Sequence, residues 1–179
     1  MDLPLKHSVS VLATAAILSA CAGYNQSSIP SCPVRISIYS TGLAAGDYYR
    51  MDAKGYHYST EFLNRNPNFP DPFKRPPTDA NGNIATDQYA YGYAGVVVYY
   101  GTDGNYAAYD LCCPKCLDAT NPLVPHWTYL DCPNCGEKFD VTQSGSGGTG
   151  IPKNGICKEG LKRYSVSYNP NTYTIEVYN

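Results

Sequence analysis

Two short cysteine motifs carry the clearest chemistry in the chain. Cys113-Pro-Lys-Cys116 and Cys132-Pro-Asn-Cys135 are Cys-x-x-Cys pairs separated by fifteen residues. This spacing is typical of a four-thiolate metal site, because each pair fits on one tight turn and two facing turns supply tetrahedral sulfur ligation. The motifs predict a metal site formed by Cys113, Cys116, Cys132 and Cys135. Disulfides or free thiols in the same loops are the alternative, since an exported chain can form disulfides.

The remaining cysteines do not form a simple disulfide set. Without Cys21, seven cysteines are left, an odd number that intrachain disulfides cannot use up. Four in a metal site leave Cys32, Cys112 and Cys157. Cys32 and Cys157 are candidates for a disulfide with each other or with Cys112, and one thiol is left over in every case.

Other catalytic and binding signals are weak, and we assign no catalytic residue. His57 and His126 are the two histidines outside the first twenty residues, and no nucleophile with a base and an orienting acid is present. Asp131, Glu137 and Asp140 flank the second cysteine pair and are expected on a solvated face. The net charge of -2 disfavours nucleic-acid binding. An enzyme acting on its own is not expected.

The N-terminus has the layout of an export signal. Residues 1–20 contain Lys6 and then a mainly apolar run of about ten residues, too short for a membrane-spanning helix. Leu18-Ser-Ala-Cys21 resembles a bacterial lipobox, which implies lipidation at Cys21 and a protein anchored through lipid to a membrane of the bacterial cell envelope. Residues 21–31 are small and polar, so we expect a tether before a domain at 32–179.

The elements that must position the cysteines are strands. Residues 33–39 alternate apolar and polar side chains, and residues 89–111 and 163–178 each read as two strands around a turn. Residues 42–87 carry many turn signals and are expected to form an irregular insertion. The chain has 18 Tyr, which we expect mostly as cross-strand packing partners. The fold class is therefore all-β and antiparallel.

Residues 95–177 resemble the Rieske domain family. The strand Tyr106–Asp110 leads into Cys113-Pro114, as in the family's first cluster loop. Residues 132–140 resemble its second loop, Cys-Pro-x-His-Gly followed by two residues and Phe-Asp. Gly150-Ile-Pro152 and Leu161 match the loop that covers the cluster. The resemblance implies a β-sandwich with a small metal-binding subdomain that carries the two cysteine pairs. Lys115 and Cys135 stand where the family has its two histidine ligands.

This departure changes the cofactor that the resemblance implies. A 2Fe-2S cluster here must be held by thiolates alone, with Cys113 and Cys132 on one iron and Cys116 and Cys135 on the other. Cys112 is an alternate ligand in place of Cys116. The expected function is electron transfer at a membrane surface, with a redox or surface protein as partner. The alternative is a binding or structural lipoprotein without redox activity, whose degenerate site holds Zn or disulfides.

Overall fold

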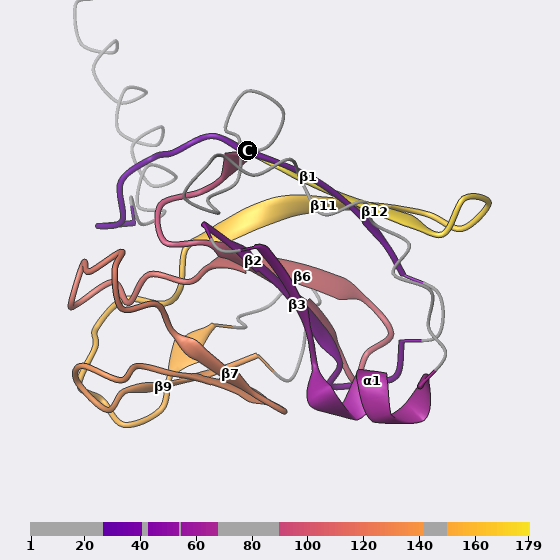
Figure 1. Ribbon diagram of the computed structural model, residues 1–179. Coiled ribbons are helices and arrows are strands. Elements are labelled where there is room, and N and C mark those ends of the chain that lie inside the picture. The colour runs from indigo at the N-terminus through magenta and orange to yellow at the C-terminus, as the bar shows by residue number, and fades with distance from the viewer. Residues whose placement is uncertain (1–26, 41–42, 54, 68–89, 142–149) are drawn as a thin grey trace, which may run out of the picture.

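The computed structural model describes residues 27–40, 43–53, 55–67, 90–141 and 150–179. These residues form mostly antiparallel strands with very little helix, which confirms the all-β prediction (Figure 1). The strands are β1 (Val34–Tyr39), β2 (Tyr48–Asp52), β3 (Gly55–Tyr58), β4 (Ala90–Tyr91), β5 (Val96–Tyr100), β6 (Tyr106–Asp110), β7 (Val124–His126), β8 (Tyr129–Asp131), β9 (Lys138–Asp140), β10 (Ile151–Pro152), β11 (Arg163–Asn169) and β12 (Thr174–Tyr178), and the helix is α1 (Thr60–Arg65).

The larger sheet has the strand order β3-β2-β5-β6-β11-β12-β1-β4 and curls on itself (Figure 1). Apolar side chains from both halves of the sheet meet in one core inside the curl. Because side chains alternate between the faces of a strand, the residues that enter this core from β1, β2, β5 and β12 are two positions apart. Its buried members are Val34, Ile36, Ile38, Tyr49, Met51, Val96, Val98, Ala108, Tyr164, Ile175 and Val177.

The smaller sheet has the order β10-β9-β8-β7 and packs against the other face of β5 and β6. Val97 and Tyr99 of β5 point into this second core, whereas Val96 and Val98 point into the first. Buried Leu130 and Phe139 come from the smaller sheet. Strand β5 is therefore buried on both faces, which explains its continuous run of apolar residues.

The strand predictions are confirmed for the regions with clear alternation. Strand β1 occupies residues 34–39, and β11 and β12 form a hairpin in which Val166 is paired with Val177. Strands β5 and β6 form the other expected hairpin, with Val98 opposite Ala108. The segment before β5 is not one continuous strand, because a turn separates β4 from β5.

The prediction of an irregular insertion at residues 42–87 is wrong for residues 48–65. Strands β2 and β3 form a hairpin, and β2 pairs with β5, with Tyr49 opposite Val98. Helix α1 follows, capped by the Ser59 side chain, which accepts the N–H of Phe62. Tyr49 and Phe62 are buried and pack against Tyr58. These elements are stabilised by contacts with distant residues, which outweigh the local turn signals. Residues 68–89 lie outside the described residues.

The hairpin β7–β8 of the smaller sheet reaches the segment before β2. Trp127, the only tryptophan, lies in the β7–β8 turn and its side chain remains largely exposed, with a relative accessibility of 64%. Its indole ring covers Gly46, where an added Cβ would lie 2.0 Å from Trp127 Nε1. Gly46 also has φ +89°, a backbone conformation that favours glycine, and a side chain at this position would displace the Trp127 ring.

Part of the expected tether at 21–31 is bound to the domain. Residues 21–26 lie outside the described residues, but Ile29 is 3% exposed and belongs to the core beneath the smaller sheet. Ser28 donates its hydroxyl to the Pro114 carbonyl at 2.8 Å, and its N–H to Glu159 at 3.1 Å. The packed domain thus begins by Ser28. In the described part of the chain, no helix is long and apolar enough to cross a membrane.

Candidate metal centre

The two cysteine pairs fold into the same kind of turn. In the first, the Leu117 N–H donates to the Cys113 carbonyl, and in the second the Gly136 N–H donates to the Cys132 carbonyl, both at 2.9 Å. The residue after each pair has a left-handed backbone, with φ +52° at Leu117 and +76° at Gly136. Leucine is rarely found in this conformation, whereas glycine adopts it without strain. We refer to residues 113–117 and 132–136 as the two knuckles.

The knuckles bring together the four predicted thiols. The sulfur atoms of Cys113, Cys116, Cys132 and Cys135 all lie within 4.8 Å of one another. The Cys113–Cys135 and Cys116–Cys132 Sγ distances are 3.8 and 3.7 Å. A tetrahedral Zn²⁺ with bonds of about 2.3 Å places its sulfur ligands about 3.8 Å apart. The donor set is therefore of the right kind and size to hold one tetrahedral metal ion.

The environments of the thiols are not equivalent. Burial raises the pKa of Cys132 and of Cys116, and their contacts with the other thiols add to this effect. Burial also disfavours the Cys135 thiolate, but the backbone N–H of Glu137 and the Cys132 thiol bring its pKa below the ordinary value. The lowered pKa favours the thiolate of Cys135, which is the form that binds a metal.

Polar side chains connect the two knuckles on their outer side. Asn134 of the second knuckle donates to the Asp118 carboxylate at 3.1 Å, and it accepts a hydrogen bond from Asn121. Asp118 also accepts the N–H and hydroxyl of Thr120. These contacts hold the loop after the first knuckle against the second, and so keep the facing orientation of the two cysteine pairs.

Asp110 at the end of β6 anchors the entry to the first knuckle. This carboxylate is fully buried and accepts the N–H of Cys112 at 2.8 Å and the hydroxyl of Tyr164 at 2.6 Å. It also accepts the N–H groups of Tyr93 and Ala94 in the turn before β5. A buried carboxylate needs such partners to offset its desolvation. Asp110 thereby ties the first knuckle to the larger sheet.

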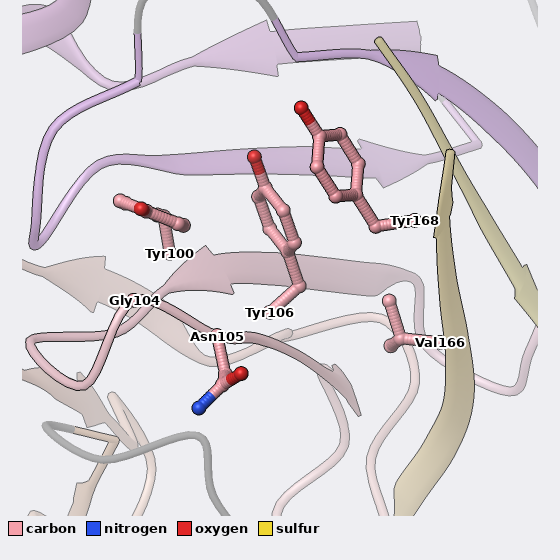
Figure 2. A pocket seen from close by; sticks show the side chains of 6 residues that line it. All are labelled: Tyr100, Gly104, Asn105, Tyr106, Val166 and Tyr168. Atoms are coloured by element: carbon pink, nitrogen blue, oxygen red, sulfur yellow. The ribbon is translucent and has the colours of Figure 1, made fainter. Parts of the chain in front are cut away.

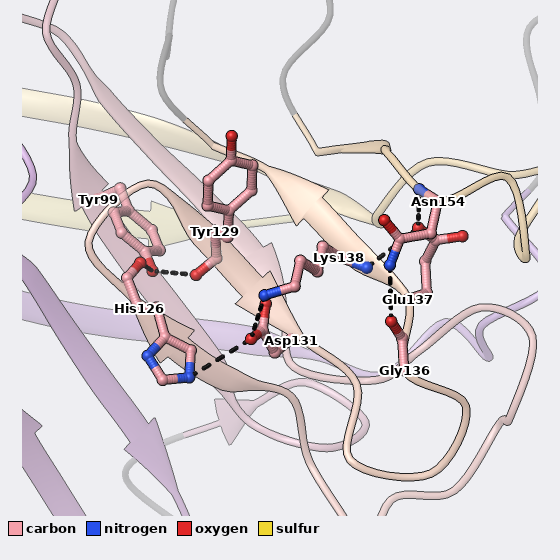
Figure 3. Close-up of polar contacts among 8 residues, drawn as sticks. All are labelled: Tyr99, His126, Tyr129, Asp131, Gly136, Glu137, Lys138 and Asn154. Atoms are coloured by element: carbon pink, nitrogen blue, oxygen red, sulfur yellow. Dashed lines mark hydrogen bonds and ion pairs between the residues drawn. The ribbon is translucent and has the colours of Figure 1, made fainter.

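Glu137 ties the second knuckle to residues 153–157. The prediction that this carboxylate lies on a solvated face is wrong. Its side chain is fully buried, and Oε1 accepts the N–H groups of Lys138, Lys153 and Asn154 at 2.6 to 3.1 Å. Oε2 accepts those of Ile156 and Cys157 at 2.7 and 2.8 Å. Although burial raises its pKa, these bonds lower it overall. Asn154 also donates to the Gly136 carbonyl (Figure 3).

The loop that Glu137 holds, residues 153–157, places a fifth sulfur beside the four. Cys157 is buried, and its Sγ lies 3.8 Å from Cys113 Sγ. It is outside the group of four, as is Cys112, whose Sγ lies 3.5 Å from the Cys113 carbonyl oxygen. Burial raises the pKa of both thiols to about 12. Cys32 and Cys157 are both free thiols, so the candidate disulfide between them is not formed in the structure.

His126 does not join the thiol cluster. Its Nε2 lies 3.5 Å from an Asp131 carboxylate oxygen, which also accepts a hydrogen bond from the Lys138 ammonium group at 3.1 Å (Figure 3). The backbone carbonyls of His126 and Tyr129 accept the hydroxyl of Tyr99. His126 therefore serves the packing of the β7–β8 hairpin on β5.

A separate pocket of about 270 Å³ lies at the end of the β5–β6 hairpin (Figure 2). Tyr100 and Tyr106 are paired across the strands with ring centroids 4.9 Å apart, and Tyr168 lies 5.1 Å from Tyr106. These contacts agree with the expectation that tyrosines act as cross-strand partners. None of the residues that line the pocket is a cysteine, histidine or carboxylate.

The fold and the site together define an all-β protein with four cysteines placed to hold a metal ion. Comparison with models of known protein families, with curated proteins and with solved structures finds no match to this chain.

Proposed function

We propose that this protein is a lipid-anchored protein of the bacterial cell envelope, in which a four-thiolate metal ion stabilises a Rieske-like β domain with a binding or structural role. The observation that supports this most strongly is the compact sulfur cluster, with all four Sγ atoms within 4.8 Å. In a two-iron cluster, the inorganic core lies between the two pairs of thiolates and separates them. Sulfur atoms this close fit the ligand sphere of one ion better, and zinc is the common occupant of closed four-cysteine sites.

The Rieske-like assignment is supported by the order of the elements around the site. The first knuckle follows β6, the second lies between β8 and β9, and the loop before β11 lies against the first knuckle. This order corresponds to the resemblance in residues 95–177. The membrane anchor is supported by the lipobox-like residues that end at Cys21.

Electron transfer is the second candidate, and the exposure of the site favours it. Cys116 and Cys135 are only half buried, so an ion held by them lies close to the surface that a redox partner could approach. Iron in the same four thiolates, or an all-cysteine 2Fe-2S cluster in a widened site, would supply the redox centre.

Metal analysis together with a visible absorption spectrum distinguishes these functions. The full chain would be expressed for export and purified anaerobically without chelator. About one zinc per chain and no visible bands would support the proposed role. Iron with thiolate-to-iron bands and a reversible redox couple would support electron transfer instead. A protein without metal, whose knuckle thiols are joined in disulfides, would contradict both metal functions.

A further inference from the structure

The chain enters the domain at the metal site. Ser28 is bound to both loops that flank the thiols: its hydroxyl donates to the carbonyl of Pro114 in the first knuckle, and its N–H donates to Glu159 of the cover loop, which we define as residues 153–159. Ile29 is buried in the core beneath the smaller sheet, and the Lys162 ammonium group donates a hydrogen bond to the Pro30 carbonyl at 2.8 Å. The point where the chain enters the domain is therefore fixed beside the knuckles.

The anchor residue is only seven positions before this point. A chain spans at most about 3.6 Å per residue, so Ser28 lies at most about 25 Å from Cys21. A domain of this length has a radius of gyration of about 15 Å, which corresponds to a diameter of about 40 Å. The anchor thus holds the knuckle end near the membrane, whereas the turn between β11 and β12 lies at the opposite end of the molecule (Figure 1).

The loops at the knuckle end also expose apolar side chains. Leu117 of the first knuckle is 41% exposed, and Ile156 of the cover loop is 37% exposed. Each lies two residues from an exposed lysine, Lys115 or Lys158. At a membrane surface, exposed apolar side chains of this kind enter the acyl-chain region, and neighbouring lysines keep their ammonium groups among the lipid headgroups.

We propose that the face formed by the two knuckles and the cover loop lies against the surface of the lipid bilayer. This inference rests on the proposed lipid anchor at Cys21 and adds an orientation to it. The metal site then faces the membrane, and access to it comes from the membrane side. The turn between β11 and β12 points away from the lipid.

Lysine acetylation of the full lipidated chain on phosphatidylethanolamine–phosphatidylglycerol vesicles tests this orientation. The variant Asn171→Lys adds a reporter amine at the exposed β11–β12 turn. Relative to the soluble Cys21→Ala protein, Lys115 and Lys158 should lose reactivity severalfold on vesicles, and the reporter amine should not. Insertion of twenty Gly/Ser residues after Ala22 should restore labelling, because a flexible linker of this length adds about 25 Å of reach.

Two measurements separate the possible failures. Flotation of the vesicles and the mass of the N-terminal peptide test the anchor itself, and an unlipidated protein that does not float would overturn both the anchor and the orientation. If the lipidated protein floats but Lys115 and Lys158 stay as reactive as in the soluble form, or the reporter amine is the protected group, the anchor stands and the orientation is wrong.

Discussion

Glu137 shows what one buried carboxylate does for the site. It accepts five backbone N–H groups, one from the adjacent Lys138 and four from the cover loop, at distances of 2.6 to 3.1 Å. The charge is fully buried, and the converging N–H dipoles stabilise it in place of water. The second knuckle and the loop that carries Cys157 thus share a single anchor.

Replacement of this anchor should be costly. We expect Glu137→Gln to lower the free energy of unfolding by about 3 kcal/mol or more, since the amide NH₂ would face N–H groups that now donate to a charged oxygen. Urea unfolding measures this loss, and amide exchange should show the loss of protection in residues 153–157. The control Glu176→Gln, at an exposed position on β12, should change stability by less than about 0.5 kcal/mol. Equal effects of the two changes would contradict the assigned role.

The fifth thiol gives a second prediction for a single residue. Cys157 lies outside the group of four although its Sγ is 3.8 Å from that of Cys113. Cys157→Ser should therefore keep the metal content of the parent protein, whereas Cys132→Ser should lose it. Metal analysis of the two purified variants decides this. Loss of metal from Cys157→Ser would show that Cys157 is a ligand.

Strand β5 links the metal site to the rest of the fold. Val97 packs in the core that contains the buried knuckle cysteines, and its neighbour Val98 packs in the core of the larger sheet. Val97→Ala and Val98→Ala should each cost about 2 kcal/mol, because both create a cavity of the same size. Only Val97→Ala should speed the transfer of metal to a competing chelator. If Val98→Ala had the same effect on metal release, the two cores would not be independent.

The elements of the site differ in how far sequence could predict them. The hairpins β5–β6 and β11–β12 were predictable because their partners are close in sequence, and the knuckles were predictable because the spacing of their cysteines is distinctive. Strand β2 was missed, because Tyr49 pairs with Val98, far along the chain. Glu137 was missed for the same reason, since its cover-loop donors lie 16 to 20 residues away. Contacts of this kind leave no local pattern.

At the scale of the whole molecule, metal removal should affect the two sheets unequally. Strands of the smaller sheet have two or three residues each, too short to be stable by themselves. The larger sheet has its own core. Treatment with a chelator should therefore abolish the protection of residues 113–140 against hydrogen exchange while β11 and β12 keep theirs. Uniform loss across the chain, or no loss at all, would contradict a local structural role of the metal.

Metal affinity should also depend on pH. The pKa values of Cys116 and Cys132 are raised in the metal-free fold, mainly by burial, so these thiols carry protons at neutral pH. Metal binds the thiolates, and uptake must release these protons. The apparent affinity should therefore rise with pH across the neutral range. Titration in weakly buffered solution would detect the released protons, and an affinity independent of pH would contradict thiolate ligation.

The position of Trp127 has a practical consequence for these experiments. The chain has one tryptophan, and its ring touches Gly46 across the boundary between the β7–β8 turn and the segment before β2. Fluorescence excited at the indole band thus arises from one place in the molecule. Because the ring is already largely in water, undocking of the hairpin should alter its anisotropy and lifetime more than its emission wavelength. The protein thereby carries its own optical probe of the smaller sheet, and no label is needed.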